Sequence, residues 1–189
     1  MSYLVLTLLY PVKLLGRLRL AMVLSYIISS IVAGIVASLA MLASLNLSKI
    51  WGIKTLDVRM MLGSFVTKKL NNQAKILGFF IFLTVGIMFS FLYGLIVFLF
   101  VTGRFGGSFG MPQYYWIPGV NFFLLYLGLL GGFGHGTFMA LIGGVLFYEL
   151  HPLPDFRETL PYVVSALIGH AIFGFTVMLV HNFILARPA

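Results

Sequence analysis

The chain has 189 residues, of which 61% are hydrophobic and only 8% are charged, and its mean hydropathy is +1.08. A soluble domain carries about 25% charged residues, so this composition excludes a soluble enzyme, excludes a disordered tail and indicates an integral membrane protein. The absence of cysteine excludes disulfides and thiolate-held metals, and the scattered net charge of +8 favours membrane lipids over nucleic acid as partners.

The apolar stretch before Pro11 is too short to cross a bilayer, which takes about 20 apolar residues. Three basic residues, Lys13, Arg17 and Arg19, follow it. We therefore predict an interfacial segment over residues 1–19, bent at Pro11, that leads into the first span.

Four longer apolar runs follow, and none of them contains Lys, Arg, Asp or Glu. They are Leu20–Leu45, Ile76–Thr102, Val120–Tyr148 and Pro161–Ala186. Each is long enough for a transmembrane helix. The sequence therefore predicts a single all-α integral membrane domain over residues 1–189. We expect a four-transmembrane-helix bundle in the cell membrane, with one or two interfacial amphipathic helices.

The connection between the first two runs carries six of the twelve basic residues. Within it, the pattern predicts an interfacial amphipathic helix over Asp57–Leu70, with Asp57 as its N-cap. The apolar positions at helical spacing are Val58, Met61, Leu62, Phe65 and Val66.

Small residues recur every four positions in the apolar runs, a spacing that lets helices pack closely in lipid. The third run has Gly128, Gly132, Gly136, Ala140 and Gly144; the second has Gly86, Ser90 and Gly94; and the first has Ser30, Gly34 and Ser38. The fourth has Ser165 and Gly169, and a second series of Ala166, His170 and Gly174. These stripes predict a tight bundle without a wide aqueous pore.

Two histidines lie among glycines within the runs: His135 in GGFGHGTFM and His170 in IGHAIFG. They are candidate ligands of haem b or contacts of a quinone. Counted from the intervening connection, their depths differ by about 6 Å at 1.5 Å per residue, which disfavours one haem between them. The alternative is a hydrogen bond to a neighbouring helix. We expect His181 near the far interface, and His151 in a solvated loop that matches no metal-binding pattern.

Four segments resemble, in the same order, a group of small prokaryotic four-span membrane proteins classed as a domain of unknown function. They are LDVRMMLGSF, LGFFIFLTVGIMFSFLYGLIVF, GLLGGFGHGTFMALIGGVLFYELHP and LIGHAIFGFTVML. The similarity covers Ser29 to Leu179. It implies the fold and a membrane location but no activity.

We expect a non-catalytic structural or accessory membrane protein that packs in a homo-oligomer or with other membrane protein subunits. No charged residue within the runs marks an ion or proton path. One alternative is a haem- or quinone-binding subunit of an electron-transfer complex that uses His135 and His170. Another is a carrier of a small neutral or lipophilic substrate.

Overall fold

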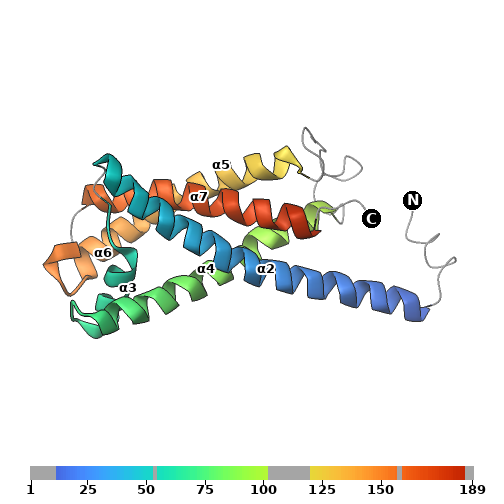
Figure 1. The fold of residues 1–189 in the computed structure, drawn as a ribbon, viewed down its shortest axis with the longest axis horizontal. Coiled ribbons are helices and arrows are strands. Elements are labelled where there is room, and N and C mark those ends of the chain that lie inside the picture. The colour runs from blue at the N-terminus through green and yellow to red at the C-terminus, as the bar shows by residue number, and fades with distance from the viewer. Residues whose placement is uncertain (1–11, 53–54, 102–119, 157–158, 186–189) are drawn as a thin grey trace.

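The computed structural model describes residues 12–52, 55–101, 120–156 and 159–185 (Figure 1). The regular elements of these residues are helices. Four helical segments are long and apolar enough to cross a membrane: Val23–Ser48, Asn72–Leu99, Phe122–Gly143 and Leu160–Ile184. The predicted fold class, an all-α four-helix bundle of a multi-pass membrane protein, is confirmed.

The elements follow one another as α2 (Val12–Ser48), η1 (Lys49–Trp51), α3 (Val58–Thr67), α4 (Asn72–Val101), α5 (Phe122–Phe138), η3 (Met139–Gly143), α6 (Gly144–Leu150), η4 (Pro154–Phe156) and α7 (Thr159–Leu185). The η3 segment is a π-helix that joins α5 directly to α6. The third apolar run is therefore one helical segment that accommodates an extra residue in one turn.

Within the described residues, the predicted interfacial segment continues into the first span without a break, and Pro11 lies outside them. Helix α2 begins at Val12 and continues without a break to Ser48 (Figure 1). Residues 12–19 are therefore the first turns of this helix, ahead of the apolar segment that begins at Val23 and could cross a membrane, and their interfacial position stays a prediction. Residues 1–11 and the glycine-rich connection at 102–119 lie outside the described part of the chain.

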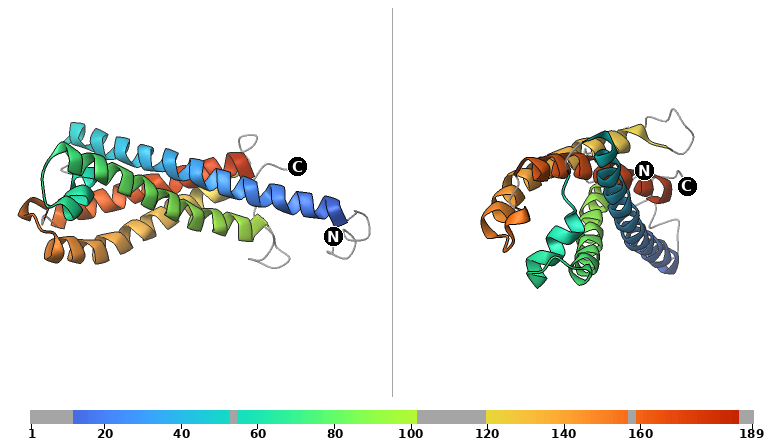
Figure 2. Two further views of the ribbon diagram at one scale, coloured as in Figure 1. Left: turned by 90° about the horizontal axis from the view of Figure 1, so that it is seen from below. Right: turned by 60° about the vertical axis from the view of Figure 1, so that its left-hand side comes forward.

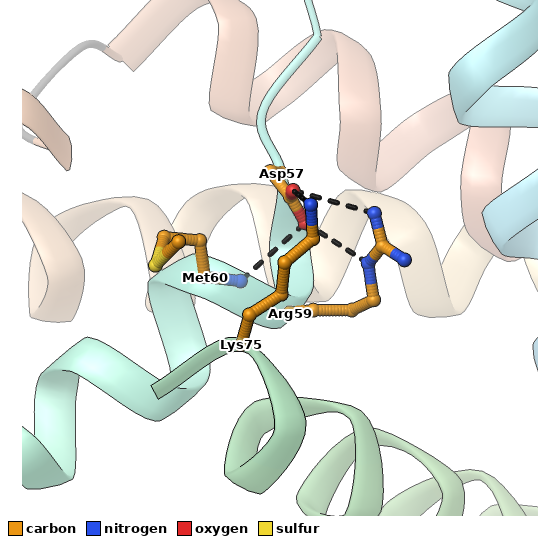
Figure 3. Close-up of polar contacts among 4 residues, drawn as sticks. All are labelled: Asp57, Arg59, Met60 and Lys75. Atoms are coloured by element: carbon orange, nitrogen blue, oxygen red, sulfur yellow. Dashed lines mark hydrogen bonds and ion pairs between the residues drawn. The ribbon is translucent and has the colours of Figure 1, made fainter. Parts of the chain in front are cut away.

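The predicted amphipathic helix exists as α3, and it begins as expected. The Asp57 side chain accepts a hydrogen bond from the Met60 amide and caps the helix (Figure 3). The helix ends at Thr67 instead of Leu70, because Lys68 turns into the left-handed region at φ 57° and its amide bonds the Ser64 carbonyl. The short helix packs on α4.

Helix α2 lies against both α4 and α7, and α7 packs along α5. The α3–α4 pair and the α5–α7 pair spread apart toward the end of the molecule where α3 and α6 lie (Figures 1 and 2). Side chains bridge α4 and α5 near the middle of the bundle, where the Phe89 ring packs on His135. This spread leaves space between the two pairs for the cavities described below.

Burial in the spanning helices is the reverse of that in a soluble protein. On α2, Ile28 and Leu39 are 57% and 47% exposed, whereas Ser29, Ala33 and Ala37 are fully buried. Large aliphatic side chains cover the outside, and small residues fill the helix contacts. This distribution suits lipid outside and close backbone approach inside.

Candidate functional site

Glycines on α5 and α7 set the distance between these two helices. A Cβ on Gly136 would lie 2.7 Å from the Ala166 carbonyl oxygen, and a Cβ on Gly132 would overlap the His170 carbonyl oxygen. A Cβ on Gly174 would overlap the Gly128 carbonyl oxygen. The structure thus places Gly128, Gly132, Gly136 and Gly174 in one backbone-to-backbone contact, which fixes where His135 and His170 lie.

The small residues of α2 and α4 form the second close contact. A Cβ on Gly34 would lie 2.9 Å from the Ile87 amide nitrogen, and the Ser30 hydroxyl lies 2.9 Å from the Cβ position of Gly94. The Ser38 hydroxyl occupies the corresponding space at Gly86. Ser90 is fully buried on α4, and on α7 Gly169 makes room for the Met41 side chain. Every predicted stripe therefore packs within this chain.

The regular spacing of four changes at η3. Ala140 is buried there, as the stripe requires. In the next turn the Tyr162 hydroxyl occupies the space beside Gly143, while a Cβ on Gly144 would make only ordinary contact with the Tyr162 ring at 3.6 Å. The extra residue of the π-turn shifts the register, so the tight position is Gly143 and not the predicted Gly144.

The structure brings His135 and His170 into direct contact. Their ring centroids lie 4.5 Å apart in an edge-to-face arrangement, and Phe89 packs on the other side of His135 at 4.2 Å. The His170 Nδ1–H donates to the Ala166 carbonyl at 2.7 Å. The remaining His170 nitrogen, Nε2, is therefore an acceptor.

The predicted depth difference of about 6 Å between these histidines is wrong. The Tyr162 hydroxyl donates to the Met139 carbonyl at 2.8 Å, so the first turn of α7 lies level with η3. Helix α6 extends past the start of α7, and counting residues from the connection overestimated the depth of His135. The two ring centroids are 4.5 Å apart, so the rings differ in depth by less than the predicted 6 Å.

The histidine pair does not fit a single haem. A metal ligated by two imidazoles lies about 2 Å from one nitrogen of each ring, which separates the ring centroids by roughly 6 Å. The centroids here are 4.5 Å apart, and the rings meet edge to face. In this arrangement His135 and His170 cannot both ligate one haem iron.

Two adjoining cavities open beside the histidines, between α2, α3, α4, η3 and α7. The larger has a volume of about 240 Å³ and is almost entirely apolar; the smaller has about 60 Å³. They share the walls Met41, Phe82, Val85, Met139 and His170. Val85 is 42% exposed on α4, so the cavities reach the outer surface of the bundle. An engineered apolar cavity of about 150 Å³ takes up benzene, so the larger one can hold a bicyclic ring or a similar piece of a lipid.

Two residues that line the smaller cavity, Ser38 and His135, carry buried polar atoms without hydrogen-bond partners among the described residues. Ser38 is fully buried, and its hydroxyl has no hydrogen-bond partner among the described residues. Both ring nitrogens of His135 are likewise buried without a partner there. An unsatisfied buried polar group costs about 1–3 kcal/mol, so a bound molecule that reached these atoms would gain from polar contact.

His181 lies inside the bundle, three residues before the end of the apolar segment Leu160–Ile184, and its position near the far interface stays a prediction. It is fully buried between α2, α4 and α7. Its Nε2 donates to the Ser90 carbonyl at 3.3 Å, and its Nδ1 contacts the Ser29 hydroxyl at 3.2 Å. The space exists because a Cβ on Gly94 would lie 2.8 Å from the imidazole. His181 cross-links three helices.

His151 is also fully buried, so the expectation of a solvated loop is wrong. Its Nε2 donates to the Met61 carbonyl at 3.1 Å, and its Nδ1 accepts from the Leu153 amide at 3.1 Å. Helix α3 covers the connection, a long-range contact that no local sequence pattern encodes. His151 fastens α3 to the segment that leads into α7.

Two further contacts were not predicted. Gly63 and Gly78 allow α3 to approach α4, since a Cβ on either would overlap backbone of the other helix. Asn121 and Asn182 join the start of α5 to the end of α7: Asn182 Oδ1 accepts from the Asn121 amide and its Nδ2 donates to the Asn121 carbonyl, both at 3.0 Å. The contact between Asn121 and Asn182 had a usable signal in the sequence, because side-chain amides are rare at the ends of apolar runs. No sequence pattern marked Met41, Phe82 and Met139 as residues that line a cavity.

Comparison with protein-family models, with curated proteins and with solved structures finds no match for this chain.

Proposed function

We propose that this chain is a non-catalytic protein of the cell membrane that binds a small lipophilic molecule inside its helix bundle. The observation that supports this function is the pair of adjoining cavities between α2, α3, α4, η3 and α7. Ligand sites in proteins are concave and mostly apolar, with a few polar groups. The larger cavity has this character, with Tyr162, Ser165 and His170 among apolar walls.

The molecule would come from the bilayer. The cavities reach the outer surface at Val85, on a helix whose outward residues are apolar, such as Met88 and Leu92. A lipophilic molecule concentrates in the hydrocarbon and would enter sideways without crossing a polar headgroup layer. Binding a neutral molecule is also a step that a carrier or a quinone-binding subunit would need.

An accessory role in a larger assembly had its main support in the small-residue stripes. Those stripes pack within the chain itself, so they give no separate support for an external partner. We therefore place ligand binding ahead of the accessory role.

The test uses naphthalene as an apolar probe of matching size and measures the thermal unfolding of the detergent-purified protein. A ligand that binds only the folded state raises its stability with concentration. We expect naphthalene to raise the unfolding temperature of the natural protein and of Leu92→Trp, a control on the exposed face of α4. Val85→Trp places an indole at the wall that both cavities share and should abolish the increase. An equal response of all three proteins, or no response of the natural protein, would overturn the proposal.

A further inference from the structure

The polar groups at the two cavities are unevenly distributed. The larger cavity extends toward α3 and is bounded there by Leu56, Val58 and Leu62. The smaller cavity adjoins the larger one at His170 and is bounded by Ser38, His135 and Phe173. A molecule that filled both would have an apolar body at the α3 end and a small polar group at the histidine end.

The polar side chains that line the smaller cavity differ in whether they can donate or accept a hydrogen bond. The His170 Nε2 can only accept, because Nδ1 carries the proton that is donated to Ala166. The His135 ring has one donor and one acceptor nitrogen in its neutral form, and both are unused among the described residues. The Ser38 hydroxyl can donate or accept and is unused as well.

The charge of the ligand is also restricted. Neither cavity is lined by Lys, Arg, Asp or Glu. An ionised group without a counter-charge is costly to bury, so a carboxylate or phosphate head does not match this site. A neutral group that both donates and accepts matches it best.

Resting on the proposed function, we infer that Ser38, His135 and His170 hold the hydroxyl group of a neutral lipophilic molecule whose apolar body fills the larger cavity. The hydroxyl donates to His170 Nε2 and accepts from His135 or Ser38. A quinone carbonyl, which only accepts, would leave His170 Nε2 without a donor. A cavity of about 60 Å³ could instead hold ordered water, and the test separates these occupants.

The experiment compares three bicyclic probes of nearly equal size: naphthalene, 2-naphthol and 1,4-naphthoquinone. Affinities for the detergent-purified protein come from the concentration dependence of its unfolding temperature. We expect 2-naphthol to bind about tenfold more tightly than naphthalene, the equivalent of about 1.4 kcal/mol, and more tightly than the quinone. Equal binding of all three probes would mean that ordered water, and not a ligand hydroxyl, bonds the polar groups of the smaller cavity. This result would overturn the inference, while the proposed function would stand. Tighter binding of the quinone would overturn the hydroxyl class. Failure of naphthalene itself to bind would contradict the proposed function.

Two serines of α2 provide a matched pair of variants. Ser38 and Ser30 are both fully buried with unpartnered hydroxyls among the described residues, but of the two only Ser38 lines either of the cavities described above. Ser38→Ala should reduce the preference for 2-naphthol over naphthalene several-fold, whereas Ser30→Ala should keep it. His135→Phe should reduce the preference further, and its retained binding of naphthalene shows that the bundle is folded. An unchanged preference in both Ser38→Ala and His135→Phe would overturn the assignment.

Discussion

The imidazole rings of His135 and His170 touch edge to face, with their centroids 4.5 Å apart, although 34 intervening residues form the end of one membrane helix, a connection and the start of another. The contact depends on glycine, because a Cβ on Gly132 would overlap the His170 carbonyl oxygen. The same glycines that hold α5 against α7 therefore place two polar rings beside an apolar cavity. The candidate site is therefore formed by the same contacts that pack α5 against α7.

The first prediction concerns the α5–α7 contact. Gly132→Ala should destabilise the protein by about 1 to 3 kcal/mol, the usual cost of overpacking, because the new methyl group meets backbone atoms that cannot yield. Thermal unfolding in detergent measures this loss. Gly134→Ala is the matched control, since Gly134 lies two residues away on α5 with nothing within 4 Å of its Cβ position. It should raise stability by about 0.5 to 1 kcal/mol, from helix propensity alone. Equal effects of the two variants would contradict the packing assignment.

The second prediction concerns Asn182, which joins the ends of α5 and α7. Asn182→Leu removes both hydrogen bonds to Asn121 and leaves the buried Asn121 amide without this acceptor. We expect a loss of about 1 to 3 kcal/mol and faster amide hydrogen exchange at the start of α5. Phe183→Leu, at a neighbouring position that is 43% exposed, should change neither quantity. Unaltered exchange at the start of α5 in Asn182→Leu would show that the amide pair does not hold this end of the bundle.

The third prediction concerns the acid sensitivity of α3. Partial burial acts to raise the pKa of the Asp57 carboxyl, but the hydrogen bond and charge of Arg59, the Met60 amide and the charge of Lys75 outweigh it and hold that pKa below its usual value (Figure 3). Because the pKa is lower in the folded protein than in the unfolded chain, Asp57 stabilises α3 fully above about pH 4. This stabilisation is lost as the pH falls through the lowered pKa.

Hydrogen exchange in α3 between pH 2.5 and 6, corrected for the intrinsic pH dependence of exchange, measures this effect. Protection of α3 should fall at the acid end in the natural protein. In Asp57→Asn the side chain can still cap the helix but cannot pair with Arg59 and Lys75, so protection should be lower at pH 6 and nearly independent of pH. The same acid-dependent loss in Asp57→Asn would assign the titration to another group.

The regular features of the fold were predictable because they follow from composition and spacing. Long uncharged apolar runs required membrane helices, and Asp57 before an apolar helical pattern marked the start of α3. The small-residue spacing marked the surfaces at which Gly132 and Gly136 meet α7. Each of these signals is local to one helix.

The remaining features depend on how the helices sit against one another. His151 is buried because α3 folds over the connection that carries it, and its ring donates to the carbonyl of Met61, a residue of α3 that lies 90 positions earlier in the chain. The contact between His135 and His170 needs α6 to extend past the start of α7. A single π-turn moved the tight position from Gly144 to Gly143. The cavity is the space left by these placements, so no sequence pattern indicated it. The resemblance to a family of unknown function stays a prediction.

The central claim is that the bundle binds a lipophilic molecule from the bilayer, and native mass spectrometry of the protein released from mild detergent tests it most directly. We predict an additional non-covalent mass on the natural protein and on Leu92→Trp that is absent from Val85→Trp, with a neutral hydroxyl-bearing compound recovered on solvent extraction of the first two. The same bound mass on all three proteins, or only bare protein in every case, would contradict the claim.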